Sequence, residues 1–204
     1  MMRVRPTVVL AALAFAASAH GTTAMLTVQV QNTLTAIDAV PTPAEIDQGF
    51  VDPTSALASL AEIATDPTTT AVATDSVGMR VRALHALSSY CTTPCADSDP
   101  AHQALVQFIT ANNTDQTGAT LVMLRGAIEA LGPQRVGTDL DLLVSLLSHP
   151  SRDIRAATAH ALRDLCNTQA IEPLRTQQGQ ETSDQVKLAI SEALRVLSQP
   201  SPCQ

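Results

Sequence analysis

Four segments of the chain repeat one pattern of apolar and small residues, and each of them closes on Ala-Leu. The segments are residues 79–87, 123–131, 154–162 and 186–194, and their closing leucines lie 44, 31 and 32 residues apart. In a helix, the first, fourth, eighth and ninth places of each segment lie on one face. The fourth place is Ala or Gly in three of the four segments. Self-similarity at this period is typical of a solenoid.

A second apolar stretch precedes each segment, at residues 57–64, 104–109, 140–147 and 171–174. Turn and capping signals, such as His149-Pro150, separate the stretches, so each unit is predicted to be a helical hairpin of helix A, turn and helix B. Aromatic residues make up only 2% of the chain, and a core rich in Ala and Leu suits closely packed helices. We predict an all-α fold, a right-handed α-solenoid of about four helical hairpins over residues 53–198, with insertions at about 66–76 and 91–99.

Residues 20–52 do not follow the repeat. The stretch from Leu26 to Gln31 alternates like a strand and could equally start a helix, and Thr42-Pro43 could open a short helix that runs to Gln48. Because a terminal repeat needs a cover for its exposed core face, we expect this segment to form an irregular, partly ordered N-terminal cap. Residues 199–204 are expected to form a C-terminal tail.

The third and fourth units resemble the HEAT-repeat family, particularly its short bacterial type of roughly 31 residues. The residues that carry the resemblance are Asp153, Ile154, Arg155, Ala157, Ala161 and Leu162, matched by Asp184, Val186, Lys187, Ala189, Ala193 and Leu194. The second unit departs from the pattern, because Leu124 replaces the basic residue. The resemblance implies that the acidic and basic residues help to join neighbouring repeats, and that the curved inner face makes protein–protein contacts without chemistry.

The first nineteen residues have the features of an export signal. Arg3 and Arg5 are followed by an apolar run at residues 8–17, which is too short to span a bilayer. Small residues then offer a cleavage site after Ala19, with a second candidate after Ala24. No later segment is long enough to cross a membrane. We expect an exported protein, periplasmic or extracellular, without membrane insertion.

Four cysteines agree with an oxidising compartment. We pair Cys91 with Cys95, and Cys166 with Cys203, so that the second bridge ties the tail to the preceding repeat. A zinc site is the alternative, but the Cys91–Cys95 spacing is x3 and no His follows at ligand spacing. A redox role is opposed by the absence of the C-x-x-C spacing.

The charge of the chain bears on its partners. Its net charge is −7, and removal of Arg3 and Arg5 with the signal leaves ten basic against nineteen acidic residues. Nucleic acid binding needs a basic surface, so nucleic acid is not an expected partner. A cationic or neutral protein partner fits this charge better.

The seventh place of each helix B holds a polar residue that is a candidate for partner binding. These residues are His85, Glu129, His160 and Glu192. Stacked B helices would bring them into a row, because packed helices lie about 8–10 Å apart. The alternatives are a solvated flank, and a metal-binding or enzyme-associated, lyase-like subunit that uses the row. Separately, cleavage after Ala19 would leave His20 as a terminal residue able to chelate copper.

No motif of catalysis accompanies the repeat. The chain has no Gly-rich phosphate loop, no G-x-S-x-G and no H-E-x-x-H. We therefore predict a binding scaffold that needs no cofactor and is not an enzyme; a purely structural role is a further alternative.

Overall fold

The computed structural model describes residues 28–35, 41–50, 52–65, 77–91, 94–200 and 203. Within these ranges every regular element is a helix and no strand is present, as the sequence predicts. The expected export signal and the expected insertion at 66–76 lie outside the described residues.

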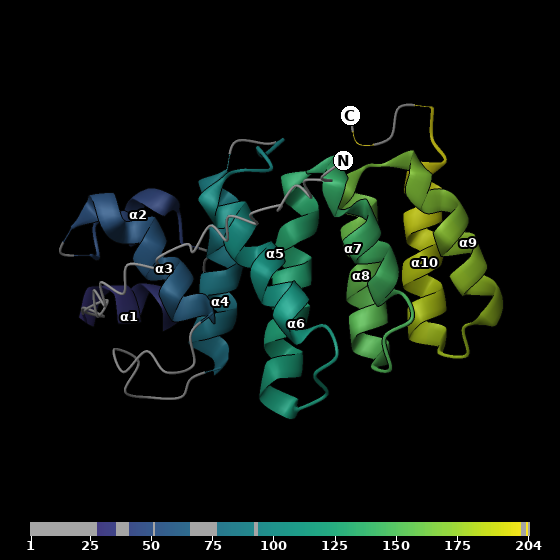
Figure 1. The fold of residues 1–204 in the computed structure, drawn as a ribbon, viewed down its shortest axis with the longest axis horizontal. Helices are drawn as coiled ribbons and strands as arrows, with labels where there is room; N and C mark the ends of the chain where they lie inside the picture. The colour runs from purple at the N-terminus through teal and green to yellow at the C-terminus, as the bar shows by residue number, and fades with distance from the viewer. Residues whose placement is uncertain are drawn as a thin grey trace, which may run out of the picture.

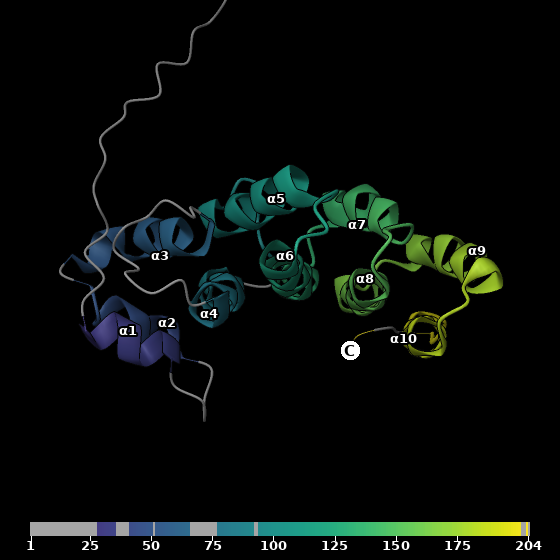
Figure 2. The ribbon, with the colours of Figure 1, turned by 90° about the horizontal axis from the view of Figure 1, so that it is seen from below.

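Eight of the α-helices in the described ranges alternate between two layers (Figures 1 and 2). The A helices are α3 (Ala56–Thr65), α5 (Pro100–Asn112), α7 (Leu140–Leu146) and α9 (Ile171–Gln180). The B helices are α4 (Val77–Leu87), α6 (Gly118–Leu131), α8 (Arg152–Leu165) and α10 (Asp184–Leu197). Figure 2 shows that the array is arched and that the B helices lie on its inner side. The molecule is an α-solenoid of helical hairpins.

Short 3-10 turns introduce or follow several helices. They are η1 (Pro53–Ser55), η2 (Ser88–Tyr90), η3 (Gly132–Gln134), η4 (Gly137–Asp139) and η5 (Thr168–Ala170). The connection from α6 to α7 contains both η3 and η4, and η3 packs against α8. This connection therefore belongs to the packed part of the solenoid.

The repeating Ala-Leu places form the core between the layers. The eighth-place alanines are at most 1% exposed, and the closing leucines of α4, α6 and α8 are fully buried. The closing leucine of α10, Leu194, is only partly buried, because α10 is the last B helix of the described array. Burial of one such leucine stabilises the fold by about 2 kcal/mol, and the small alanines allow the helices to approach closely.

Two glycines set the separation of neighbouring B helices. A Cβ on Gly132 would lie 2.6 Å from the carbonyl oxygen of Ala161 in α8, and a Cβ on Gly126 would lie 3.1 Å from Val81 Cγ1 in α4. The contact of Gly132 is with backbone, which cannot move aside. The contact of Gly126 is with the end of a side chain.

The N-terminal segment is helical rather than a strand. The helix α1 (Val28–Thr35) contacts α4, and α2 (Pro43–Asp47) contacts α3. Thr42 caps α2, with a reciprocal hydrogen bond from its N–H to Glu45 at 2.8 Å. The Tyr90 hydroxyl donates to Asp47 Oδ1 at 2.8 Å, and burial with this bond raises the pKa of Tyr90. The two helices bury Val30, Leu34 and Ile46 and so cover the first repeat.

At the other end of the described array, α10 presents a mostly polar face to solvent. The exposed side chains of α10 are largely polar, including Gln185, Lys187 and Ser191, beside Leu188, which is 71% exposed. A polar outer face is what a terminal repeat requires. Among the described residues, no helix combines the length and apolar character that a membrane crossing would need.

Candidate partner-binding face

The structure divides the predicted row of seventh-place residues into two clusters. In the first, His85 Nε2 in α4 lies 3.6 Å from Glu129 Oε2 in α6. Arg125, one turn earlier in α6, holds the other oxygen of Glu129 at 2.7 Å. Burial lowers the pKa of His85, and the neighbouring Arg125 acts in the same direction, while Glu129 opposes them. The pair is held together by close packing of α4 on Gly126.

The second cluster is organised by Arg163 in α8. Its Nη1 lies 2.7 Å from Glu192 Oε1 in α10 and 3.4 Å from Nδ1 of His160. Its Nε donates to Asp164 at 2.7 Å, and this bond is the first cause that raises the pKa of Arg163. Arg163 lies one turn after His160 and just outside the repeated segment, so the predicted row does not contain it. His160 and Glu192 are thus linked through a cation.

The row does not form a set of metal ligands. Within the ranges that the structure covers, the His, Cys, Asp and Glu side chains whose ligand atoms gather in a group of three are Cys91, Cys95 and Asp99. A guanidinium between His160 and Glu192 also repels a metal cation. No observation on the row favours the metal-binding or enzyme-associated alternative.

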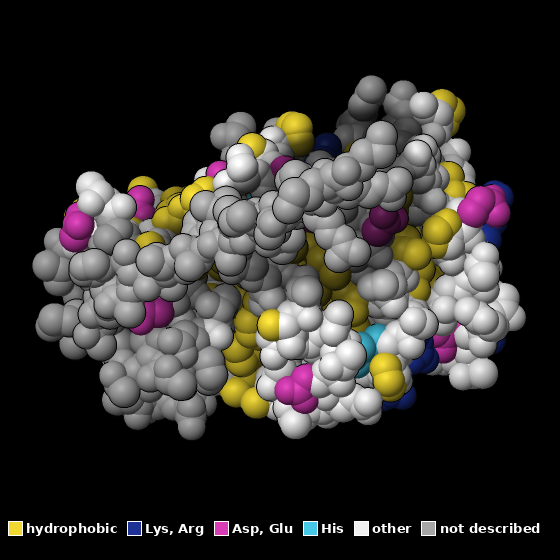
Figure 3. Space-filling model, in the orientation of Figure 1, with side chains coloured by type: hydrophobic (Ala, Val, Ile, Leu, Met, Phe, Trp, Pro, Cys, Tyr) yellow, Lys and Arg dark blue, Asp and Glu magenta, His cyan; other side chains and the backbone are white. Residues whose placement is uncertain are grey.

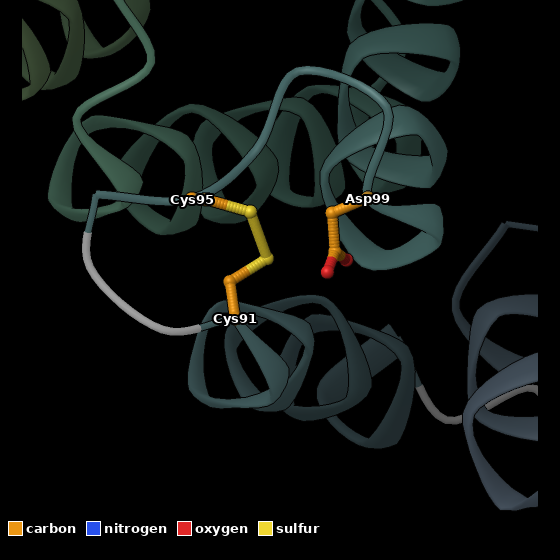
Figure 4. A group of neighbouring side chains, drawn as sticks. All are labelled: Cys91, Cys95 and Asp99. Atoms are coloured by element: carbon orange, nitrogen blue, oxygen red, sulfur yellow. A yellow bond between two sulfur atoms is a disulfide. The ribbon is translucent and has the colours of Figure 1, made fainter.

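Cys91, Cys95 and Asp99 form a disulfide and a helix cap rather than a metal site. Cys91 and Cys95 are joined in a disulfide, with the Asp99 carboxylate beside it (Figure 4). Disulfide sulfurs are not thiolates, and the thiolate is the metal ligand. Asp99 accepts the backbone N–H of Ala101 at 2.9 Å and so caps α5. The sequence reasoning considered the two cysteines and missed Asp99.

The second expected cysteine pair is joined as well. The Cys166–Cys203 disulfide closes a sequence separation of 37 residues and returns the tail to the end of α8. It forms one wall of a cavity of about 780 Å³ beside the second cluster. The lining includes Pro133, Arg135, Arg163, Glu192, Val196 and Cys203. This volume lies within the range of ligand pockets in proteins, about 300–1,000 Å³.

The joint between the third and fourth repeats is a buried ion pair. Arg155 in α8 donates from Nε and Nη2 to the two oxygens of Glu181, at 2.7 and 2.8 Å. Its Nη1 donates at 2.9 Å to the carbonyls of His149 and Pro150, in the turn before α8. The Glu181 side chain is only 2% exposed, and the bond from Arg155 lowers its pKa to about 2.

This joint identifies the acidic residue that pairs with Arg155. The partner of Arg155 is Glu181, not Asp153, which lies 3.4 Å from Gln185 Nε2 and 3.8 Å from Arg152. Glu181 precedes α10 and accepts the backbone N–H groups of the next two residues, at 3.0 and 2.9 Å. Only a carboxylate at the turn, rather than on the helix, reaches both the neighbouring repeat and these amides.

A buried polar cluster joins the second and third repeats and was not predicted. The ring Nδ1 of His102 in α5 lies 2.9 Å from Gln134 Oε1, and its Nε2 lies 3.5 Å from Oδ1 of both Asp97 and Asp139. Burial raises the pKa of Asp139 to about 6, His102 opposes the rise, and Asp97 adds to it. No periodic signal marks this cluster, because its members come from a helix start and two connections.

Two layers of helical hairpins with these joints define a helical-repeat solenoid. A family model described as HEAT repeats matches residues 120–195, from α6 to α10, and supports the assignment of this region to HEAT repeats. HEAT repeats commonly mediate protein–protein interactions and are generally scaffolds without enzymatic activity. No curated protein matches the chain.

Proposed function

We propose that this protein is an exported scaffold that binds a protein partner on the inner face of its solenoid. The observation that carries the proposal is that the B helices, which lie on the inner side of the arch (Figure 2), carry both polar clusters and contribute to the lining of the 780 Å³ cavity. A concave face of this kind offers a continuous surface to a folded partner or an extended segment.

The polar clusters suit a binding face because they are ordered and still accessible. Glu192 is 43% exposed and Glu129 is 30% exposed, although each is held by an arginine. Side chains that are already fixed lose less conformational entropy when a partner binds. The export signal and the two cysteine pairs of the sequence support the assignment to a periplasmic or extracellular compartment.

The other layer provides a matched control surface. Glu172 and Arg175 in α9 form an exposed ion pair at 2.7 Å. Figure 3, drawn in the orientation of Figure 1, shows acidic and basic side chains side by side over α9. Reversal of Glu172 therefore removes the same kind of surface ion pair as reversal of Glu192, but on the opposite layer.

The test is affinity capture with the mature chain from its own envelope or culture fluid. We expect Glu129→Arg/Glu192→Arg to lose the proteins that the wild type captures, and Glu172→Arg/Asp141→Arg in α9 and α7 to retain them. Circular dichroism melts of all variants establish that they are folded. Equal capture by both double variants would reject binding through the inner face.

Export has its own test. Mass spectrometry of the protein recovered outside the cytoplasm is expected to give a chain that begins at His20 or Met25. A chain that starts at residue 1 and stays in the cytoplasm would contradict the export part of the proposal and leave the binding part standing.

A further inference from the structure

The cavity at the C-terminal end of the inner face has walls from three parts of the chain. Arg135 follows η3, Glu192 and Val196 belong to α10, and the Cys166–Cys203 disulfide brings in the tail. Apolar surface is contributed by Pro133, Val196 and the disulfide. The cavity therefore combines an apolar wall with a charged rim, as binding pockets do.

The backbone around this cavity is strained in three places. Arg135, Cys166 and Cys203 have φ values of 57°, 61° and 69°, and they are all the non-glycine residues in the left-handed region among those that the structure covers. All three line the cavity. Such a conformation costs about 1–3 kcal/mol per residue and clusters at functional sites. Glycine would adopt this backbone conformation with less strain than arginine. The presence of Arg135 therefore indicates that its side chain has a role.

Two guanidinium groups lie on the rim, and only that of Arg163 is paired with a carboxylate among the described residues. Arg163 is engaged by both carboxylates of the rim, Asp164 and Glu192, each at 2.7 Å. The exposed side chain of Arg135 makes no hydrogen bond or ion pair with any described residue. Its planar fork of donors matches a carboxylate, which it can bind through two parallel hydrogen bonds.

The position of Arg135 is fixed by buried neighbours. Gln134, which is 1% exposed, is held by His102 Nδ1 at its side chain and by the N–H of Cys95 at its carbonyl, at 2.8 Å. On the other side, Gly132 packs against the backbone of Ala161. The turn that carries Arg135 is thus held between α5 and α8, and the Arg135 side chain is exposed.

From these observations we propose that the cavity binds a short segment of the protein partner in which a carboxylate side chain lies between apolar side chains. The carboxylate pairs with Arg135, and an apolar neighbour packs on Pro133, Val196 and the disulfide. This inference rests on the proposed function and deepens it by naming the chemistry of the partner. It also gives a local exception to the cationic or neutral partner that the net charge suggests.

The probe for the test is a pool of capped pentapeptides, acetyl-Gly-Φ-Glu-Φ-Gly-amide, in which Φ is Leu, Ile or Val. The matched pool has Gln in place of Glu. Binding to the ¹⁵N-labelled mature chain is followed by amide chemical shifts. We expect saturable shifts at residues 134–137, 163–166 and 192–196, with at least tenfold weaker binding of the Gln pool.

Two variants locate the interaction. Arg135→Gln is expected to bind the Glu pool no better than the Gln pool, and Arg175→Gln, a change of the same kind on α9, is expected to bind like the wild type. Equal binding of the two pools to the wild type, shifts elsewhere, or no saturable shift would overturn the inference. If that happens while Glu129→Arg/Glu192→Arg still abolishes partner capture, the inference fails and the proposed function stands.

Discussion

The α8–α10 joint and the α4–α6 joint connect equivalent helices of neighbouring repeats by different means. Arg155 and Glu181 form a buried ion pair across the first joint, with three hydrogen bonds from neighbours to the same carboxylate. At the second joint Gly126 lets Val81 and His85 of α4 pack directly on α6. The second place of α6 is Leu124, which is fully buried in the core.

The difference explains where the repeat pattern is strong. The basic member of the charged joint, Arg155, stands at the second place of the repeated segment, so this part of the joint leaves a pattern that can be recognised in the sequence. A joint made by close packing only needs small and apolar residues, and many sequences satisfy it. The family match accordingly extends from α6 to α10 and does not reach α4.

The largest effect is expected from breaking the charged joint. Glu181→Ala leaves Arg155 with half of its partners and two backbone amides without an acceptor, so we expect a loss of about 3–5 kcal/mol in the free energy of unfolding. Urea titration measures it. The exposed pair provides the control, because Glu172→Ala is expected to cost less than about 0.5 kcal/mol. Similar losses in the two variants would mean that the buried joint is no stronger than a surface pair.

The two disulfides provide the next comparison between the regions. On the chain-entropy model, replacement of Cys166 and Cys203 by Ser lowers the free energy of unfolding by about 4 kcal/mol. Replacement of Cys91 and Cys95 lowers it by about 2 kcal/mol, because the loop that this disulfide closes is much shorter. Melting temperatures of the two double variants, with and without reductant, measure the order. A larger loss for the Cys91/Cys95 variant would contradict it.

Close packing is tested by adding one methyl group at three glycines. Gly132→Ala meets the backbone of α8 and is expected to cost about 2–3 kcal/mol. Gly126→Ala meets the movable end of Val81 and gains helix propensity inside α6, so its net effect is expected to be less than about 1 kcal/mol. Gly137→Ala is the control, since a Cβ there has no neighbour within 4 Å. Chemical denaturation of the three variants gives the ranking, which fails if Gly137→Ala is the most damaging.

The last comparison concerns the dependence of stability on pH, and the two joints differ in the sign of this dependence. The folded pKa of Glu181 is lowered from 4.5 to about 2, so the stability it contributes is present above pH 4.5 and is lost as the pH falls toward 2. Asp139 has the opposite shift, from 3.8 to about 6, so stability decreases as the pH rises from about 4 to 6.

Carboxyl ¹³C chemical shifts test both titrations in one sample. We expect midpoints near pH 2 for Glu181 and near pH 6 for Asp139. Asp139→Asn is expected to remove the decrease in stability between pH 4 and 6, and Glu181→Gln the decrease below pH 4.5. A midpoint for Asp139 below about 4 would show that its burial does not control the proton.

The architecture could be predicted from periodicity because the relevant contacts are local. The Ala-Leu places of α8 and α10 repeat at helical spacing, and burial of one face follows from that spacing. The same reasoning left open whether residues 26–31 form a strand or a helix, because six residues with alternating polarity fit both. Packing of Val30 and Leu34 against the first repeat favours the helix.

The site was predictable only in part. The shared seventh place of the B helices predicted that His85 lies near Glu129, because stacked helices repeat the same register. It did not reveal that Arg163 stands between His160 and Glu192, since the reach of an arginine side chain depends on the local distance between helices. Arg135 carries no repeat signal at all, because it lies in a connection between repeats.

The sequence by itself determined the helical hairpins, their order and the places that form the core, because these depend on spacing along one chain. Only the tertiary structure decided which charges meet. Glu181 is the partner of Arg155 because a turn of the next repeat lies against α8. Asp164 and Glu192 pair with Arg163, and Arg135 has no ion-pair partner among the described residues. Ion pairing depends on distances of a few ångströms between residues 26 to 29 positions apart, and no periodicity in the sequence encodes such distances.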